Sequence, residues 1–359
     1  MKANKIKLFL HIGQPKTGTS AIQSYLNYNR VKLFKEHYAL YPNFNNKNPA
    51  LGSMHNHAQF FMSYKVKNDK PGCISSFSNC IRFCRKHHIN KLIISNEGFK
   101  WHWWPEWMKE IVNIFDLDLE IILYLRRQDK WLESGWKQWG HKIPECNTIQ
   151  DYEEQTNCDW NKAIIPWLNH FDKSSFIIRP YEKTTIGDNI VIDFMTITGI
   201  PNFQGVIPPT TSLNSNNGFS RDVIEILNMC KGLVKNTNDH RLLEFMERRL
   251  PPELKKDPMN EYNIFSSEER LRIIHKYNDS NIKLAKYFSL KDNILFHEPL
   301  PESDEKWEPY PGLSLEKVIP IFIAIALNQE KEITRLSRIS IRDLFIKKIK
   351  VFINSGRLS

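Results

Sequence analysis

The stretch that most constrains this chain is residues 6–26, where an apolar run leads through a short loop of small residues into a helical pattern. Residues 6–12, Ile-Lys-Leu-Phe-Leu-His-Ile, predict a buried strand. Residues 13–18, Gly-Gln-Pro-Lys-Thr-Gly, form the loop, and residues 19–26 place apolar side chains on one face of a helix. Loop N–H groups and the positive end of a helix dipole both attract anions. We therefore predict a phosphate-binding loop.

The position of its lysine separates this loop from a Walker A loop. A Walker A loop needs a lysine directly after its last glycine. Here Thr19 follows Gly18, and Lys16 comes two residues before that glycine. The run Pro-Lys-Thr-Gly-Thr-Ser resembles the 5′-phosphosulfate loop of sulfotransferases, which use 3′-phosphoadenosine 5′-phosphosulfate (PAPS). A strand-to-helix turn with an exposed lysine is the structural alternative.

Three further apolar runs predict buried strands, at 91–95, 119–125 and 175–179. A polar side chain follows each run: Glu97, Arg126 and Tyr181. The carboxyl ends of parallel strands meet at one edge of a sheet, where ligands bind in open α/β folds. We expect these side chains to lie beside the loop at 13–18.

The arginine after the 119–125 run strengthens the resemblance. Arg126 and Ser134 stand eight positions apart, and the string Leu-Arg-Arg-Gln-Asp-(x)4-Ser-(x)3-Gln is similar to the 3′-phosphate motif of bacterial sulfotransferases. The Tyr-Glu pair at 181–182 is a further family feature, with the tyrosine near the adenine. Taken alone, Arg126 could equally be a surface or helix-capping arginine.

The resemblance to the PAPS-dependent sulfotransferase family implies a fold, a reaction and a set of roles. The fold would be α/β: a P-loop-like three-layer structure with a central, mostly parallel sheet over 1–300, followed at 301–359 by a linker and a basic helical extension. The reaction would move a sulfuryl group from PAPS to a hydroxyl or amine acceptor, leaving adenosine 3′,5′-bisphosphate and requiring no metal. Lys16 would be catalytic. The implied cofactor-binding residues are Lys16, Thr17, Gly18, Thr19, Ser20, Arg126, Ser134 and Tyr181.

The base that takes the acceptor proton has three candidates, Glu97, His55 and His57. Family members use either glutamate or histidine. Glu97 directly follows a predicted strand, and a cleft walled by Trp101 and Trp103 would raise its pKa by desolvation. We therefore predict Glu97 as the base, with the two histidines as acceptor-positioning alternates. Helix capping is the structural alternative for Glu97.

The tryptophans at 101, 103, 104 and 107 have two interpretations, packing under a loop or a wall of the acceptor cleft. The second, together with the net charge of +10, favours a saccharide or glycan acceptor. The six cysteines show no regular spacing, which predicts free thiols. Zinc at Cys80, Cys84, His87 and His88 is disfavoured, because Cys84 belongs to an apolar helical face and the paired Cys-x-x-Cys spacing of structural sites is missing.

Basic residues are concentrated at the end of the chain, where 329–359 holds eight Lys or Arg against three Asp or Glu. A basic amphipathic helix is predicted near 330–353. It would dock on an anionic membrane surface, or pack on the body or a second subunit. No apolar run of about 18 residues or signal segment is present, which predicts a cytoplasmic protein, with the inner membrane surface as the second location. No nucleic-acid partner is expected, and the oligomeric state stays open.

Two other function classes compete with the sulfotransferase interpretation. A P-loop nucleotide kinase or NTPase would need a lysine after Gly18 and a strand-end aspartate for Mg²⁺, and neither stands in the sequence. A non-catalytic binder of anionic polymers accounts for the basic charge but not for the loop.

Overall fold

A computed structural model describes residues 5–187, 189–200, 205, 219–236, 239–255, 264–302 and 307–337. The chain divides into two compact units. Unit 1 comprises 1–135, 153–216 and 265–307, and unit 2 comprises 136–152, 217–264 and 308–359. Both units are therefore assembled from segments that are separated in sequence. The division of the chain into functional domains at residue 300 stays a prediction.

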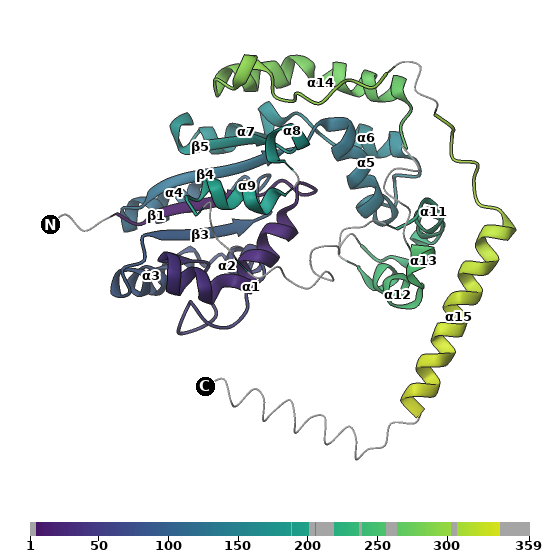
Figure 1. The fold of residues 1–359 in the computed structure, drawn as a ribbon, viewed down its shortest axis with the longest axis horizontal. Helices are drawn as coiled ribbons and strands as arrows, with labels where there is room; N and C mark the ends of the chain where they lie inside the picture. The colour runs from purple at the N-terminus through teal and green to yellow at the C-terminus, as the bar shows by residue number, and fades with distance from the viewer. Residues whose placement is uncertain are drawn as a thin grey trace. The chain divides into compact units, whose positions relative to one another are not determined.

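Unit 1 is built on a five-stranded sheet in which every strand pair is parallel (Figure 1). The strands are β1 (Lys7–Ile12), β2 (Ala39–Leu40), β3 (Lys91–Asn96), β4 (Asp118–Leu125) and β5 (Phe176–Pro180), in the order β2-β3-β1-β4-β5. The predicted α/β class and parallel central sheet are confirmed. Sequence patterns identified all of these strands except the two-residue β2.

Helices lie between successive strands along the chain and continue after β5. They are α1 (Thr19–His37), α2 (Ala58–Val66), α3 (Lys70–Lys86), α4 (Trp104–Phe115), α5 (Gln128–Trp139), α6 (Ile149–Gln155), α7 (Trp160–Leu168), α8 (Lys183–Ile186), α9 (Ile190–Ile197), α11 (Arg221–Met229), α12 (Arg241–Arg249), α13 (Pro252–Lys255), α14 (Ser267–Tyr287) and α15 (Leu315–Ser337). Helix α14 begins with a capping box. The Ser266 hydroxyl accepts a hydrogen bond from the Glu269 N–H, and the Glu269 carboxylate accepts one from the Ser266 N–H.

The core of unit 1 lies on both faces of this sheet. On one face α1 and α9 cover Phe9, Ile93 and Ile122, with Leu26 and Phe194 among the buried side chains that meet there. Helix α4 lies on the opposite face (Figure 1). Burial on both faces is typical of parallel strands and explains why the strands appear in the sequence as near-continuous apolar runs.

The strand order fixes where a ligand site can form. The chain leaving β1 crosses to the β2–β3 side of the sheet, whereas the chain leaving β4 crosses to the β5 side. The loops after β1 and β4 therefore diverge at the carboxyl ends of the strands, which is where open parallel sheets bind ligands. These ends lie on the right of the sheet in Figure 1.

Unit 2 is helical in the described residues. The α15 side chains Ile321 and Ile325 are buried with side chains of α11 and α12, including Leu227 and Met246. Of the tail helix predicted near 330–353, residues 330–337 are the end of α15, and the remainder lies outside the described residues. No described helix combines the length and apolar character needed to cross a membrane.

All six cysteines are free thiols, as predicted. Cys80 and Cys84 are buried on the inner face of α3 together with Phe77. Within the described ranges no three His, Cys, Asp or Glu side chains gather as a metal site would require.

Candidate functional site

The loop between β1 and α1 contains two residues in the left-handed region, Lys16 with φ 69° and Gly18 with φ 74°. Two features of position 18 favour glycine, its positive φ and its close neighbours. It avoids the cost of a side chain at positive φ, and a Cβ there would lie 3.0 Å from Ile190 and 3.2 Å from Tyr181. Left-handed residues alternating with their neighbours direct successive N–H groups into a concavity that holds anions.

Three successive carbonyl groups of the loop accept hydrogen bonds from side chains. Thr17 Oγ1 donates to Gln14 O at 2.5 Å, Trp131 Nε1 to Pro15 O at 2.8 Å, and Arg126 Nη1 to Lys16 O at 3.1 Å. In a trans peptide the N–H points opposite to the carbonyl. Holding the carbonyls of Pro15 and Lys16 therefore also fixes the directions of the next two N–H groups.

The start of the loop is tied to both neighbouring strands. Gly13 N–H donates to Asn96 O of β3 at 2.7 Å, and Gln14 Oε1 accepts from the Arg126 N–H after β4 at 3.1 Å. A Cβ on Gly13 would lie 2.1 Å from a Thr19 methyl group, so only glycine fits this contact. The loop is therefore positioned by the sheet itself.

Glu97 meets the same loop from the end of β3. The Thr19 hydroxyl donates to Glu97 Oε1 at 2.6 Å, and Glu97 is half-buried. The structure thus brings together the predicted base and a predicted phosphate donor. Because Thr19 is the first residue of α1, this carboxylate lies at the N-terminal end of that helix.

Arg126 and Tyr181 lie beside the loop on the β4–β5 side of the sheet. The Arg126 guanidinium lies 5.6 Å from the centre of the Tyr181 ring, and burial lowers the pKa of Arg126, which nevertheless stays charged. Ser134 lies on α5 and is half-buried. In the described part of the chain its hydroxyl makes no hydrogen bond with Arg126. Arg126 and Tyr181 therefore lie together beside the loop. Ser134 lies nearly two turns after the start of α5.

The adjacent arginine, Arg127, has a different environment. It is buried, donates to Asp129 Oδ1 at 2.8 Å and also binds two backbone carbonyls, those of Glu298 and Pro299. Arg270 from α14 binds the same Asp129 and also Glu133. Burial alone would raise the pKa of Asp129, but the two arginines hold it below its usual range. Arg127 therefore anchors the fold, and Arg126 faces the loop.

The two candidate histidines differ sharply in their surroundings. His57 is fully buried: Nε2 donates to Pro42 O at 2.9 Å, and Nδ1 accepts from Ser95 N–H at 3.1 Å. Burial lowers the pKa of His57 to about 4. His55 is exposed, and its Nε2 forms a hydrogen bond of 3.0 Å with the Ser24 hydroxyl. Although the residue as a whole is exposed, its ring is partly buried, and this lowers the pKa of His55.

Several polar residues at the site were not identified from the sequence. Asn96 is fully buried beside Glu97, and neither side-chain polar atom has a partner among the described residues. Beneath the loop, Ser95 Oγ pairs with His11 Nδ1 at 2.8 Å and with Gln23 Nε2 at 3.1 Å. Burial lowers the pKa of His11 to about 3. The sequence signal is the polar run Ser-Asn-Glu that closes an apolar strand.

The tryptophans divide between the two predicted roles. Trp104 and Trp107 are buried in the core. Trp101 and Trp103 are half-exposed and stacked, with ring centres 5.4 Å apart and planes at 16°. Only the second pair could present an aromatic surface to a ligand.

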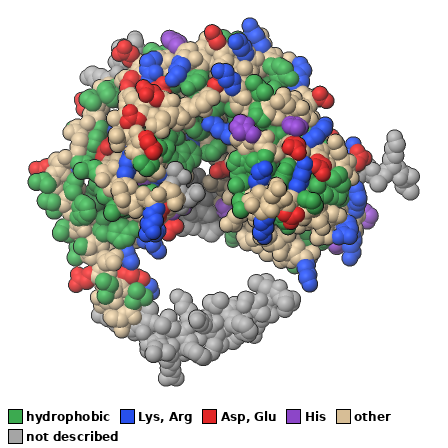
Figure 2. Space-filling view, turned by 180° about the vertical axis from the view of Figure 1, so that it is seen from behind, with side chains coloured by type: hydrophobic (Ala, Val, Ile, Leu, Met, Phe, Trp, Pro, Cys, Tyr) green, Lys and Arg blue, Asp and Glu red, His purple; other side chains and the backbone are tan. Residues whose placement is uncertain are grey.

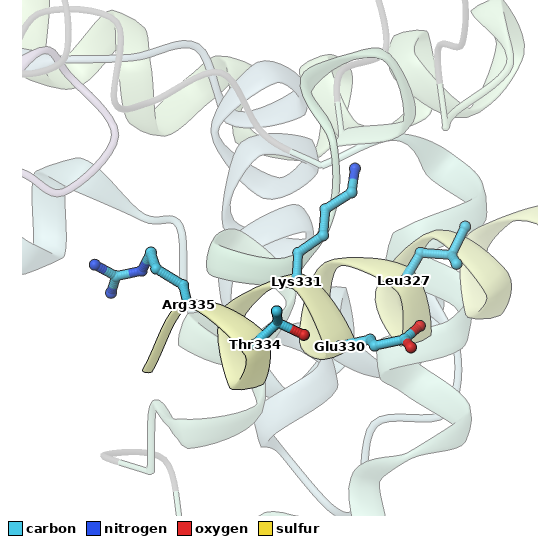
Figure 3. Close-up of a pocket in the computed structure, with 5 residues that line it drawn as sticks. All are labelled: Leu327, Glu330, Lys331, Thr334 and Arg335. Carbon is cyan, nitrogen blue, oxygen red and sulfur yellow. The ribbon is translucent and has the colours of Figure 1, made fainter. Parts of the chain in front are cut away.

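Two surface features carry less chemical information. On the face drawn in Figure 2, described Lys and Arg side chains are interspersed with Asp and Glu. A hollow on α15 is lined by Leu327, Glu330, Lys331, Thr334 and Arg335, all from that one helix (Figure 3). No groups from separate elements converge among these lining residues.

Comparison with known proteins adds one relative. No protein-family model matches the chain. An uncharacterized protein of Archaeoglobus fulgidus is 28% identical over 207 residues, which is 56% of this chain and 54% of the relative. The chain therefore spans about half the length of that relative, whose description gives no activity.

Proposed function

We propose that this protein is a PAPS-dependent sulfotransferase with a P-loop-like fold, as the sequence motifs suggest. The observation that carries the proposal is the hydrogen bond from Arg126 to the Lys16 carbonyl. It places an arginine beside a loop whose geometry suits phosphate and whose lysine precedes the last glycine. A kinase-type loop would carry its lysine on the other side of that glycine.

The residues fit the parts of such a nucleotide. The proposed donors for the 5′-phosphate are the N–H groups of Thr17 and Gly18 in the loop and of Thr19 and Ser20 in α1, since the first N–H groups of a helix have no partner within it. A guanidinium has five N–H donors, so Arg126 can bind the 3′-phosphate while keeping its bond to Lys16. Ser134 would assist it, and Tyr181 offers a ring face near the adenine.

Sulfuryl transfer, like phosphoryl transfer, depends mainly on positioning and on stabilising charge as it develops. Lys16 would neutralise the oxygen that bridges phosphate and sulfur as that bond breaks. Glu97 would take the acceptor proton, because it meets the loop directly through Thr19. His55 stays an alternate for positioning the acceptor. Both ring nitrogens of His57 already bind backbone groups, which favours a structural role.

The acceptor class follows from less specific features. The half-exposed stack of Trp101 and Trp103 resembles a surface on which a sugar ring could lie. Together with the basic net charge, it supports a hydroxylated, saccharide-like acceptor. Use of PAPS would place the protein in the cytoplasm.

A transfer assay tests this function. The protein would be incubated with PAPS labelled in the sulfuryl group and with glycan, phenol, lipid or amine acceptors. We expect labelled product and a stoichiometric amount of adenosine 3′,5′-bisphosphate from wild type, and neither from Lys16→Ala. Bisphosphate release that is equal in wild type and Lys16→Ala would contradict the proposal.

A further inference from the structure

A second group of basic side chains lies in unit 2, in residues that the proposed function does not use. Lys142 is only 3% exposed at the end of the short 3-10 helix η1 (Gly140–Lys142), and its Nζ donates to His240 Nδ1 at 2.7 Å. Lys231, in the 3-10 helix η3 (Lys231–Leu233), donates to the Cys146 carbonyl and lies 5.5 Å from the centre of the Trp136 ring.

Neither lysine forms an ion pair with a described carboxylate. The nearby acids are bound by other groups. Asp239 pairs with Arg241 at 2.6 Å, Glu225 with Arg221 at 2.7 Å, and Asp151 accepts two backbone N–H groups. A buried ammonium without a counter-ion is costly, so an anion from outside the chain would be strongly favoured here.

Several buried polar side-chain atoms around the two lysines have no partner among the described residues. Both ring nitrogens of His141 and the Trp136 Nε1 are buried without a partner among the described residues. A Cβ on Gly140 would lie 2.3 Å from the Trp136 ring, so this ring packs directly against the backbone of η1. Helix α11, which packs on η1, carries Asn228, whose side-chain amide is likewise buried without a described partner. Buried polar groups are normally satisfied, so the unpaired Trp136 N–H, the N–H of the neutral His141 ring and the Asn228 amide N–H together indicate a missing acceptor.

We propose that unit 2 binds an oxyanion group at Lys142 and Lys231, with His141 and Trp136 as further donors. His240, the hydrogen-bond partner of Lys142, is itself exposed, so the buried lysine lies one side chain beneath the surface. Sulfate and carboxylate share the required chemistry. The source is either a free inorganic ion or an acidic group on a saccharide.

The pKa of the buried His141 ring can report anion binding at this site. Burial and then the neighbouring Lys142, Lys231 and His240 lower the pKa of His141 to about 4. An anion bound at this site would favour the protonated ring. We expect the His141 pKa, followed by NMR of the full-length protein, to rise by about one unit or more with sodium sulfate relative to sodium chloride at equal ionic strength.

Two variants separate this site from other effects. Lys142→Met should weaken sulfate binding about 10-fold or more while leaving the melting temperature without sulfate unchanged or higher, since it removes a buried unpaired charge. The matched control is Lys235→Met, an exposed lysine four residues after Lys231. It should bind sulfate as wild type does.

The loop in unit 1 could also bind sulfate, so the His141 titration is repeated in Lys16→Ala. The sulfate-dependent shift should persist there, which makes this test independent of the proposed sulfotransferase activity. A glucuronate-containing disaccharide forms the second arm, and tighter binding than inorganic sulfate would identify a saccharide acid as the source. An unchanged His141 pKa with both probes, or equal sulfate affinity in Lys142→Met and wild type, would overturn the proposal.

Discussion

The Nη1 atom of Arg126 lies 3.1 Å from the carbonyl oxygen of Lys16 and donates a hydrogen bond to it. This bond joins the residue after β4 to the loop after β1, across the point where the two connections diverge. One contact thus links the residue proposed to bind the 3′-phosphate and the lysine proposed to stabilise the bridging oxygen. Its consequences can be tested residue by residue.

Replacement of Lys16 should separate catalysis from folding. Lys16→Ala should lower turnover about 10²–10³-fold, the range for losing one charge-stabilising donor. Because Lys16 has a positive φ, Lys16→Gly should be more stable than Lys16→Ala by about 1 kcal/mol, yet equally slow. Denaturant unfolding and steady-state turnover measure the two effects, with the exposed Lys35→Ala as control. Wild-type turnover in Lys16→Ala would remove Lys16 from the mechanism.

Arg126 and Arg127 should respond in opposite ways. Arg126→Ala should weaken binding of adenosine 3′,5′-bisphosphate by about 1.5–3 kcal/mol while sparing adenosine 5′-phosphate. Arg127→Ala should instead lower the free energy of unfolding by about 3 kcal/mol, because it breaks a buried ion pair with Asp129. Titration calorimetry and denaturant unfolding of both variants check this. Equal losses for both nucleotides in Arg126→Ala would mean that Arg126 does not recognise the 3′-phosphate.

Glu97→Gln keeps the shape of the side chain and removes the base. It should preserve bisphosphate binding and cut turnover about 10²-fold or more. Glutamine can still accept the bond from Thr19, so the loop should keep its structure. Turnover of His55→Ala and His57→Ala is the comparison: normal turnover in Glu97→Gln with an inactive His55→Ala would assign the base to His55.

Stability should fall as the solution becomes acidic. The pKa of His57 is about 4 in the fold and about 6.5 when unfolded, so its neutral form contributes stability above pH 6.5. That contribution, about 3 kcal/mol, is lost as pH falls from 6.5 towards 4, because the unfolded chain then binds the proton more tightly. Unfolding free energies measured between about pH 7 and 4 should have a shallower pH slope in His57→Asn. The exposed His88→Asn should keep the wild-type slope.

The sequence predicts the sheet well because its strands are buried on both faces, which leaves continuous apolar runs such as 119–125. It also predicts that Glu97, Arg126 and Tyr181 share an edge, since strand ends of a parallel sheet must meet. Contacts between distant segments have no such local signal. Nothing near Trp131 in the sequence indicates its bond to the Pro15 carbonyl.

The sequence also does not distinguish the roles of neighbouring residues of the same type. Arg126 and Arg127 differ through distant segments: Arg126 donates to the Lys16 carbonyl, whereas Arg127 binds the carbonyls of Glu298 and Pro299. His57 belonged to a local His-x-His pattern, yet its ring binds the backbone of Pro42 and Ser95. The assembly of each unit from separate segments of the chain could likewise not be predicted from composition, because it depends on packing of helices that are far apart in sequence.

We propose that the loop after β1 and Arg126 together bind a nucleotide that carries both a 5′- and a 3′-phosphate. Isothermal titration of the full-length protein with adenosine 3′,5′-bisphosphate, and separately with ATP and Mg²⁺, tests it most directly. We predict saturable binding of the bisphosphate that is tighter than ATP binding and is weakened in Arg126→Ala but not in Lys35→Ala. Tighter binding of ATP with Mg²⁺, or no binding of either nucleotide, would contradict the account.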